Sequence, residues 1–578
     1  AGQAGIPPAG EFDVSDGAPP GVGLPGDAPP RLAVLDGVPL ENHDFLAGRL
    51  IVDDPEGWAA EVPASRRIHG TAMASLAVHG DLSQPQDPPR ERIYIRPILR
   101  FEAPAWVQDA REEMPADRLV VDLIHSAVAR ILEGDTAVAP TVRVISLSVA
   151  DPSQAFHQFV SPWARLLDWL SDRYRVLFLV CAGNQTADIS VPRDTDVDDP
   201  AAVEAAVLEA IRREALARRI FAPAEAINAL TIGAAHDDGA GAMAAAPRMN
   251  PLRTASLASV VSPIASGFRR SLKPEILIAG GRQLLQVAPV PAAGELTLQV
   301  RPSTRPPGVQ AASPDPGAGS TSRTTYVCGT SAATALAARG ALTVLDRLDW
   351  LREVWGPAFP SPRYDDVLVK ALLTHTATWG DARQAVAAAL TAAGEPTGRA
   401  SIARFLGYGA AVPERSLLIG SDSEITALYA EDIEEGDAHQ YLLPLPPGLA
   451  ASTVERRLTI TLAWTSPINP RHRAYRRAAL AVEPGNPGEV FGGREEADKY
   501  AARRGTLQHE TLRGRRAVPF LDGDTATFTV SCRSDAGDLD KPIPYALIAT
   551  LAVPLGQNVQ VYSEVRERLL VRVPVRPR

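Results

Sequence analysis

Three short segments, far apart in the chain, each place one reactive side chain at the edge of an apolar run. The run RLAVLD ends at Asp36, the segment HGTAMASLAVHG begins at His69, and CGTSAATALAARGAL presents Ser331. A serine hydroxyl becomes a good nucleophile when a histidine takes its proton, and a carboxylate holds that histidine in the right tautomer. Taken singly, each residue is more often a cap or turn residue. Taken together, they predict a nucleophilic serine site that only the folded chain assembles.

The order Asp…His…Ser is one of three orders in which unrelated folds use this trio. The sequences around the three residues read DG at Asp36, HGT at His69 and GTS at Ser331. In all three places the chain resembles the subtilisin-like serine proteases, or subtilases. The resemblance implies that Ser331 attacks a carbonyl carbon, that His69 acts as general base and then acid, and that Asp36 orients His69.

Three further segments strengthen the resemblance. CAGN ends at Asn184 and is similar to the oxyanion-hole segment of the family, which implies that Asn184 is a donor and that Gly183 contacts substrate. KPEILIAGG (273–281) is similar to the strand and glycine turn that precede the family's serine. VISLS (144–148) resembles the strand whose backbone pairs with an extended substrate, which implies a substrate-binding role for Ser146, Leu147 and Ser148. The six motifs cover roughly residues 31–415.

The chain also departs from the family pattern. Directly after Ser331 it reads AATA, where the family commonly has Met-Ala and then Pro. The substrate-flanking segment LSVADP lacks the glycines often found there. These departures concern the shape of the side pockets and leave the chemistry unchanged.

Composition indicates a soluble globular protein of more than one domain. The chain has 578 residues, a formal net charge of −10 and a hydrophobic content of 45%, with a mean hydropathy of −0.05. The acidic balance argues against a nucleic-acid partner, which needs a basic surface. No run approaches the roughly 20 apolar residues that span a bilayer. Few cysteines and no visible signal peptide favour the cytoplasm.

The cysteines and acidic loops do not form a recognisable metal or redox site. Cys181, Cys328 and Cys532 are an odd, sparse set, so we expect buried small hydrophobes and no disulfide framework. There is no HExxH motif and no zinc-spaced Cys/His cluster. The resemblance leaves a structural calcium ion open, yet the acidic loops 80–89 and 194–200 have no clear ligand pattern. We therefore expect no cofactor.

Continuous apolar runs alternate with helical stretches over the first two thirds of the chain. Such runs are typical of strands covered on both faces, and the alternation predicts a doubly wound α/β domain with a parallel sheet. Active sites of such sheets gather at the carboxyl ends of the strands. The expected strands are 31–37, 92–99, 142–150, 174–184, 229–235 and 275–280, and the expected helices are 70–80, 116–134, 157–172 and 331–348.

Two insertions interrupt this pattern. Within 195–220, Asp199 as N-cap and Pro200 at the first helical position predict a surface helix. The segment 301–326 is rich in Pro, Gly and Ser and poor in large apolar residues, which predicts a mobile loop near the cleft.

The pattern changes after about residue 420. Short β-like runs separated by turn residues predict a C-terminal β-sandwich or jelly-roll-like domain over 420–578. The preceding residues divide into a flexible Pro/Gly-rich arm (1–30) and a subtilisin-like catalytic domain (31–415).

These observations favour a serine endopeptidase that hydrolyses peptide bonds through an acyl-enzyme. The alternative is a latent or regulatory protein on a protease scaffold that acts or binds only with a partner. A peptide ligase is a third option, for which the sequence has no mark. The expected partners are a protein or peptide substrate and, under the alternative, a regulatory protein, with no nucleic acid and no membrane.

Overall fold

The computed structural model describes residues 23–101, 112–241, 248–289, 294–317, 319–415, 422–485, 490–496 and 499–571. Most of the predicted N-terminal arm therefore lies outside the described residues.

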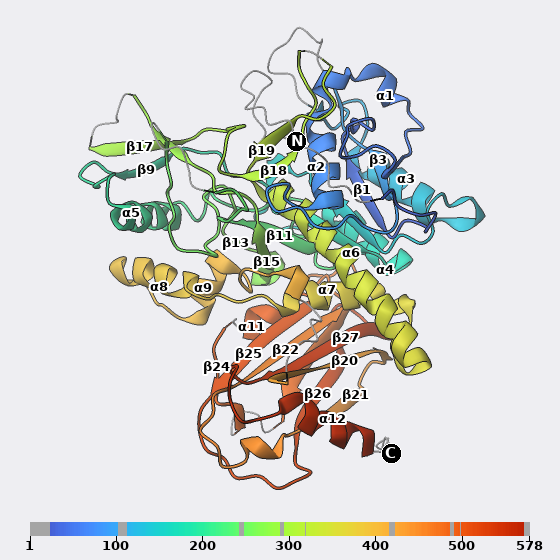
Figure 1. Ribbon diagram of the computed structural model, residues 1–578, viewed down its shortest axis with the longest axis vertical. Helices are drawn as coiled ribbons and strands as arrows, with labels where there is room; N and C mark the ends of the chain where they lie inside the picture. Colours follow the sequence, from blue (N-terminus) through green and yellow to red (C-terminus); the bar gives the residue numbers. More distant parts are fainter. Residues whose placement is uncertain are drawn as a thin grey trace.

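A seven-stranded parallel sheet forms the centre of the N-terminal part of the chain (Figure 1). Its strand order is β15-β11-β8-β6-β1-β3-β2, so β6, β8, β11 and β15 follow outward in chain order on one side of β1, and β3 lies between β1 and the edge strand β2 on the other. The six predicted strands are all present, and the short β2 was not predicted. The strands are β1 (Leu32–Asp36), β2 (Leu50–Val52), β3 (Ile93–Pro97), β6 (Val144–Leu147), β8 (Leu177–Cys181), β11 (Leu230–Ala235) and β15 (Ile276–Ala279).

Helices cover both faces of this sheet, as predicted for a doubly wound α/β fold. Alternate residues of β1 point to opposite sides: Leu32 and Val34 join one core, and Ala33 and Leu35 join the other. Because both faces are buried, the strands are apolar throughout. The first core contains α2 (Ile68–His79), α6 (Thr330–Trp355) and α7 (Asp365–His375), and the second contains α3 (Val120–Leu132) and α4 (Pro162–Tyr174).

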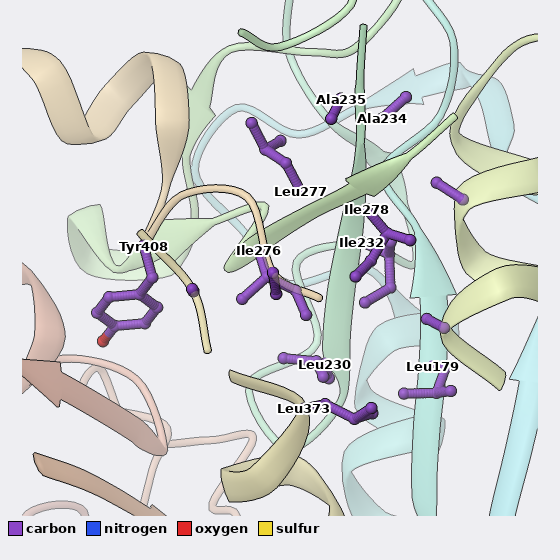
Figure 2. Close-up of a cluster of buried hydrophobic side chains, with 14 of the residues drawn as sticks. Leu179, Leu230, Ile232, Ala234, Ala235, Ile276, Leu277, Ile278, Leu373 and Tyr408 are labelled. Carbon is purple, nitrogen blue, oxygen red and sulfur yellow. The ribbon is translucent and has the colours of Figure 1, made fainter. Parts of the chain in front are cut away.

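The first core continues to the boundary with the C-terminal part. Figure 2 shows Ile232 of β11 and Ile276 of β15 in one cluster with Leu373 of α7. Tyr408 lies at the edge of this cluster, and its hydroxyl donates to the carbonyl oxygen of Leu507 at 2.7 Å. The core of the parallel sheet is therefore tied directly to a strand of the C-terminal part.

The insertion at 195–220 forms helix α5 (Pro200–Arg213), as predicted. The side chain of Asp199 accepts a hydrogen bond from the Ala201 amide at 2.9 Å, which satisfies one of the unpaired donors of the first turn. The remaining short elements of this part are α1 (Trp58–Glu61), α8 (Ala382–Ala392), α9 (Arg399–Leu406), β4 (Arg100–Phe101), β5 (Glu112–Glu113), β7 (Asp151–Ala155), β9 (Ile189–Pro192), β10 (Phe221–Ala222), β12 (Arg248–Met249), β13 (Ala265–Ser266), β14 (Leu272–Lys273), β16 (Leu285–Val287) and β17 (Glu295–Val300).

The prediction of a mobile loop at 301–326 is wrong. The segment contains an antiparallel hairpin of β18 (Val309–Ala312) and β19 (Thr324–Val327). Its few apolar side chains are buried against α2, with Val309 fully buried beside Met73 and Leu76. Composition gave the wrong prediction because the segment needs no hydrophobic core of its own. Its few apolar residues pack against helix α2 instead.

The C-terminal part forms two antiparallel sheets with a shared hydrophobic core, which lie below the parallel sheet in Figure 1. This confirms a β-rich region after the α/β part. The first sheet contains β20 (Glu424–Ile433), β27 (Ile543–Ala552), β22 (Arg456–Trp464), β25 (Leu507–Gly514) and β24 (Gly493–Arg494); the second contains β21 (Ala438–Pro444), β26 (Thr525–Ser534) and β23 (Ala478–Pro484); α11 (Lys499–Ala502) and α12 (Val561–Val571) accompany them.

Candidate active site

Asp36 and His69 meet at the carboxyl edge of the parallel sheet. Asp36 is the last residue of β1 and His69 is the second residue of α2. The His69 Nδ1–H donates to Asp36 Oδ1 at 2.5 Å, and both side chains are buried. The Gly37 amide also donates to Asp36 Oδ1, at 2.7 Å. The carboxylate thereby fixes the tautomer of His69 and leaves Nε2 as the proton acceptor.

Gly37 and Gly70 let the end of β1 and the start of α2 approach closely enough for the Asp36–His69 hydrogen bond to form. A Cβ atom on Gly70 would lie 2.2 Å from the carbonyl oxygen of Gly37, which is far inside van der Waals contact. Any larger residue at position 70 would push the start of α2 away from the end of β1. The glycine of the HGT segment is therefore required by packing at the Asp36–His69 contact.

The electrostatics of His69 favour the charged imidazolium. Burial lowers the pKa of His69, but the adjacent Asp36 carboxylate outweighs burial and raises this pKa above its ordinary value of 6.5. A base of raised pKa accepts a proton readily, and the resulting imidazolium stays paired with the carboxylate.

A second carboxyl group, which the sequence did not predict, lies against the same histidine. Glu112 of β5 is buried, and its Oε2 accepts a hydrogen bond from the His69 backbone amide at 2.8 Å. Its Oε1 has no hydrogen-bond partner among the described residues. A Cβ atom on Gly37 would lie only 2.0 Å from this oxygen. Burial raises the pKa of Glu112 to about 8. Glu112 thus caps the start of α2 and covers the acid–base pair.

Ser331 lies in the first turn of α6, and a second pair of glycines brings it into place. Gly329 precedes the helix with φ of 136°, a conformation that favours glycine. Its amide donates to the Gly280 carbonyl oxygen at 2.7 Å. A Cβ on Gly280 would lie 2.9 Å from the Gly329 carbonyl oxygen, so the segments touch backbone to backbone. This explains the GG that ends the KPEILIAGG segment.

The hydroxyl of Ser331 points to Ser148 in this conformation. Ser331 Oγ donates to the Ser148 carbonyl oxygen at 2.8 Å, and Ser148 Oγ donates back to the Ser331 carbonyl oxygen at 3.3 Å. Within the described part of the chain, no hydrogen bond joins Ser331 to His69. A rotation about the Ser331 Cα–Cβ bond would be needed to redirect the hydroxyl, and catalytic hydrogen bonds often tighten only in the substrate complex.

Asn184 is oriented by the residue before Ser331. Its Oδ1 accepts from the Thr330 amide at 2.9 Å and from the Thr330 hydroxyl at 3.1 Å. The Gly183 carbonyl oxygen lies 3.0 Å from the same Thr330 Oγ1, so the single hydroxyl proton is shared between the two acceptors. Because Thr330 donates to Asn184 Oδ1, the Nδ2 group is the part of the Asn184 side chain that could donate to an anion. The sequence predicted Asn184 but not the role of Thr330 in holding it.

Comparison with known proteins identifies the family. The family model described as "Subtilase family" matches residues 30–409. The chain belongs to the subtilase family. An "Uncharacterized protein y4bN" of Sinorhizobium fredii (strain NBRC 101917 / NGR234) is 25% identical to this subtilase over 465 residues, which is 74% of this chain and 95% of that protein.

The chain also matches solved structures of proteases, at low sequence identity and low TM-score. The prenylagaramide maturation protease PagA is 16% identical, with a TM-score of 0.36 over 66% of this chain and 90% of that chain. The epidermin leader peptide processing serine protease EpiP of Staphylococcus aureus is 12% identical, with a TM-score of 0.36 over 69% of this chain and 77% of that chain.

The predicted substrate-binding residues of the subtilase lie in different surroundings. Ser146 and Leu147 lie inside β6, which pairs with β1 on one side and β8 on the other. Their backbone groups pair within the sheet and their side chains are buried, and their role in substrate binding stays a prediction. Ser148 follows the end of β6, and its carbonyl oxygen accepts a hydrogen bond from Ser331 Oγ.

Gly183 lies beside the nucleophile but is backed by an aromatic ring. Its φ is 89°, and a Cβ atom there would lie 2.4 Å from the ring of Phe221. Phe221 packs with Ala150 and Cys181 in a small apolar cluster. The space next to Gly183 is therefore narrow and apolar.

Among the described residues near the site, there is neither a reactive thiol nor a metal-binding cluster. Burial raises the pKa of the Cys181 thiol to about 12, so it remains protonated and is a poor nucleophile. In the part of the chain that the structure describes, no three His, Cys, Asp or Glu side chains cluster closely enough to hold a metal ion. The expectation of no cofactor, with a structural calcium ion left open, stays a prediction. No helix among the described residues is both long and apolar enough to cross a membrane.

Proposed function

We propose that this subtilase is a serine endopeptidase that cleaves peptide bonds through an acyl-enzyme. The observation that carries the proposal is the buried Asp36–His69 hydrogen bond of 2.5 Å at the sheet edge where Ser331 begins α6. Membership of the subtilase family supports a serine protease with a protein or peptide substrate. The residue roles and the acyl-enzyme are our inference from the arrangement of the side chains.

In the proposed reaction, Ser331 Oγ attacks the carbonyl carbon of the scissile peptide bond while His69 Nε2 takes the hydroxyl proton. The Asp36 carboxylate stabilises the imidazolium that forms. The oxyanion is held by the Ser331 amide, which has no intrahelical partner at a helix start, and by the Asn184 side-chain amide. His69 then protonates the leaving amine, and a water molecule hydrolyses the ester by the same steps in reverse.

A latent form of the same enzyme is the second candidate. His69 is only 2% exposed, and the Ser331 hydroxyl is bonded to Ser148. Both features suit a protease that needs substrate or a regulatory protein to turn Ser331 toward His69. In that case the free chain would cleave slowly and a partner would raise turnover.

Cleavage of an unfolded protein by purified chain tests the proposal. We expect Ser331→Ala to lower turnover by about 10⁶, the scale measured for loss of the nucleophile in subtilisin. Ser153→Ala, an exposed serine outside the site, is the matched control and should retain full activity. Equal activity of the two variants would contradict the assignment of Ser331.

A further inference from the structure

A large cavity lies at the junction of the α/β part with the C-terminal sheets. Its volume is about 1800 Å³. Its walls come from the segment after β7, the loop after α5, the β13–β14 region, α9, the loop before β23, and α11. Asp36, His69, Asn184 and Ser331 are not among its lining residues. Peptide cleavage as proposed above does not use this cavity.

The lining of this cavity is strongly basic. Among the described lining residues, Asp535 is the one carboxylate, and it is already paired with Arg269 at 3.2 Å and with Arg476 at 3.1 Å. The whole chain carries a formal net charge of −10, so this concentration of positive charge is a local feature. The eight arginines of the lining are Arg165, Arg219, Arg269, Arg270, Arg404, Arg471, Arg473 and Arg504.

Most of these guanidinium groups are not neutralised by the protein. Within the described residues, no ion pair involves Arg165, Arg270, Arg404, Arg471, Arg473 or Arg504, whereas many other arginines of the chain are paired. The Nε of Arg165 is buried and has no hydrogen-bond partner there. Like charges gathered without counter-charges repel one another, and a bound anion would remove this cost.

Aromatic rings stand exposed among the arginines. Phe159 is 81% exposed and Tyr500 is 63% exposed, and both line the cavity together with Phe268. Exposed rings are costly in water and serve as stacking platforms for the bases of nucleotides. A ligand of carboxylates alone would leave these rings unused.

We propose that this cavity binds a nucleotide-type ligand, with its phosphates on the arginines and its base against Phe159 or Tyr500. Guanidinium groups bind phosphate in a bidentate manner. The volume exceeds the roughly 300–1,000 Å³ of ordinary small-molecule sites. The cavity therefore has room for a dinucleotide or short oligonucleotide. The acidic composition, which argued against a nucleic-acid partner, hides this local basic surface.

Calorimetric titration of the full chain carrying Ser331→Ala tests the proposal independently of protease activity. The probes are ATP, inorganic tripolyphosphate, a short oligothymidylate and a hexaglutamate peptide, each at low and at moderate salt. The test variant is R471A/R473A, and the control is R193A/R383A, which removes two exposed arginines outside the cavity. A second test variant, F159A/Y500A, removes the rings.

We expect ATP and tripolyphosphate to bind, and R471A/R473A to weaken both by about tenfold or more. The control should leave both affinities unchanged, and F159A/Y500A should weaken ATP and oligothymidylate but not tripolyphosphate. Absence of ATP binding, or equal losses in the two arginine variants, would overturn the proposal. Tighter binding of hexaglutamate than of every phosphate ligand would overturn it in favour of an acidic protein segment.

Discussion

Glycines at positions 70 and 329 set the distances on which the proposed chemistry depends. Gly70 lets the His69 helix touch the end of β1, and Gly329 leaves room for the Asn184 amide, whose Nδ2 lies 2.9 Å from the position of a Cβ there. The positions of the proposed reactive residues therefore depend on neighbouring glycines as much as on their own side chains. This is why the short motifs from which we predict the roles of Asp36, His69 and Ser331 include these glycines.

Glu112 shows what short motifs cannot predict. It lies in the sequence REEMP, 43 positions after His69, and the neighbouring Glu113 is exposed. No spacing or periodicity marks which of the two glutamates is buried against His69. Only the folded β4–β5 hairpin distinguishes them.

The raised pKa of Glu112 predicts a pH dependence of stability. Burial raises this pKa from 4.5 to about 8, so between these values the folded chain holds a proton that the unfolded chain has lost. The free energy of unfolding should therefore fall as pH rises from 5 to 8, by at most about 1.4 kcal/mol per pH unit. Glu112→Gln should remove this contribution while keeping an acceptor for the His69 amide.

Urea unfolding at pH 5 and pH 8 measures the effect. Glu113→Gln is the matched control, because its side chain is exposed. If the wild type, Glu112→Gln and Glu113→Gln all change equally with pH, Glu112 does not hold a proton in the folded state.

Asn184→Ala should lower kcat much more than it changes KM. The amide is proposed to donate to charge that exists only in the transition state, so its loss does not affect substrate binding. In subtilisin, loss of one such donor costs about 10²–10³ in turnover, and we expect a similar loss here. Steady-state kinetics with a peptide substrate measure both constants. An effect confined to KM would place Asn184 outside the oxyanion hole.

At the level of elements, the α2 helix depends on the β18–β19 hairpin. The Ala312 amide donates to Ser75 Oγ of α2 at 3.0 Å, and the Gln310 amide donates to Asp81 Oδ1 at 3.0 Å. Val309 packs beside Met73 of the same helix. The hairpin therefore supports the element that carries His69.

Val309→Ala should lower the free energy of unfolding by about 2 kcal/mol, since it removes two buried methyl groups and leaves a cavity. Val412→Ala is the control: Val412 is 42% exposed, and its truncation should cost less than about 0.5 kcal/mol. Guanidinium unfolding compares the two. A small and equal effect would mean that the hairpin does not stabilise α2.

The elements that sequence patterns predicted well are those buried on both faces. The six apolar runs became strands of the parallel sheet, and Asp199-Pro200 marked the start of α5 correctly. The patterns failed for β2, which has three residues, and for the β18–β19 hairpin, which lies in a segment rich in Pro, Gly and Ser. A continuous apolar run also does not show where a strand ends, so the sequence alone did not place Ser146 inside β6 and Ser148 beyond its end.

At the scale of the whole molecule, helix α7 joins the parallel sheet to the C-terminal sheets. The Lys370 Nζ is buried and donates to the Asn228 carbonyl oxygen at 3.0 Å and to Thr506 Oγ1 at 2.7 Å. Asn228 and Ser466 exchange two hydrogen bonds, of 2.9 and 3.0 Å. The two parts thus share buried polar contacts in addition to apolar packing.

These contacts predict that the two parts unfold together. Calorimetry of the full chain should give one cooperative transition, and a chain ending at residue 415 should lose stability because the α7 face would be exposed. The domain boundaries predicted from sequence, 31–415 and 420–578, would then mark structural units that are not independently stable. Two well-separated transitions, with the shorter chain retaining its midpoint, would contradict this.

We propose that Asp36, His69 and Ser331 form one working site. Labelling of the isolated full chain with a fluorophosphonate, followed by peptide mapping, tests it most directly. We expect a single adduct on Ser331, abolished by Ser331→Ala, strongly reduced by His69→Ala and unchanged by Ser153→Ala. No adduct in the isolated chain, or an adduct on Ser331 that forms equally fast without His69, would contradict it.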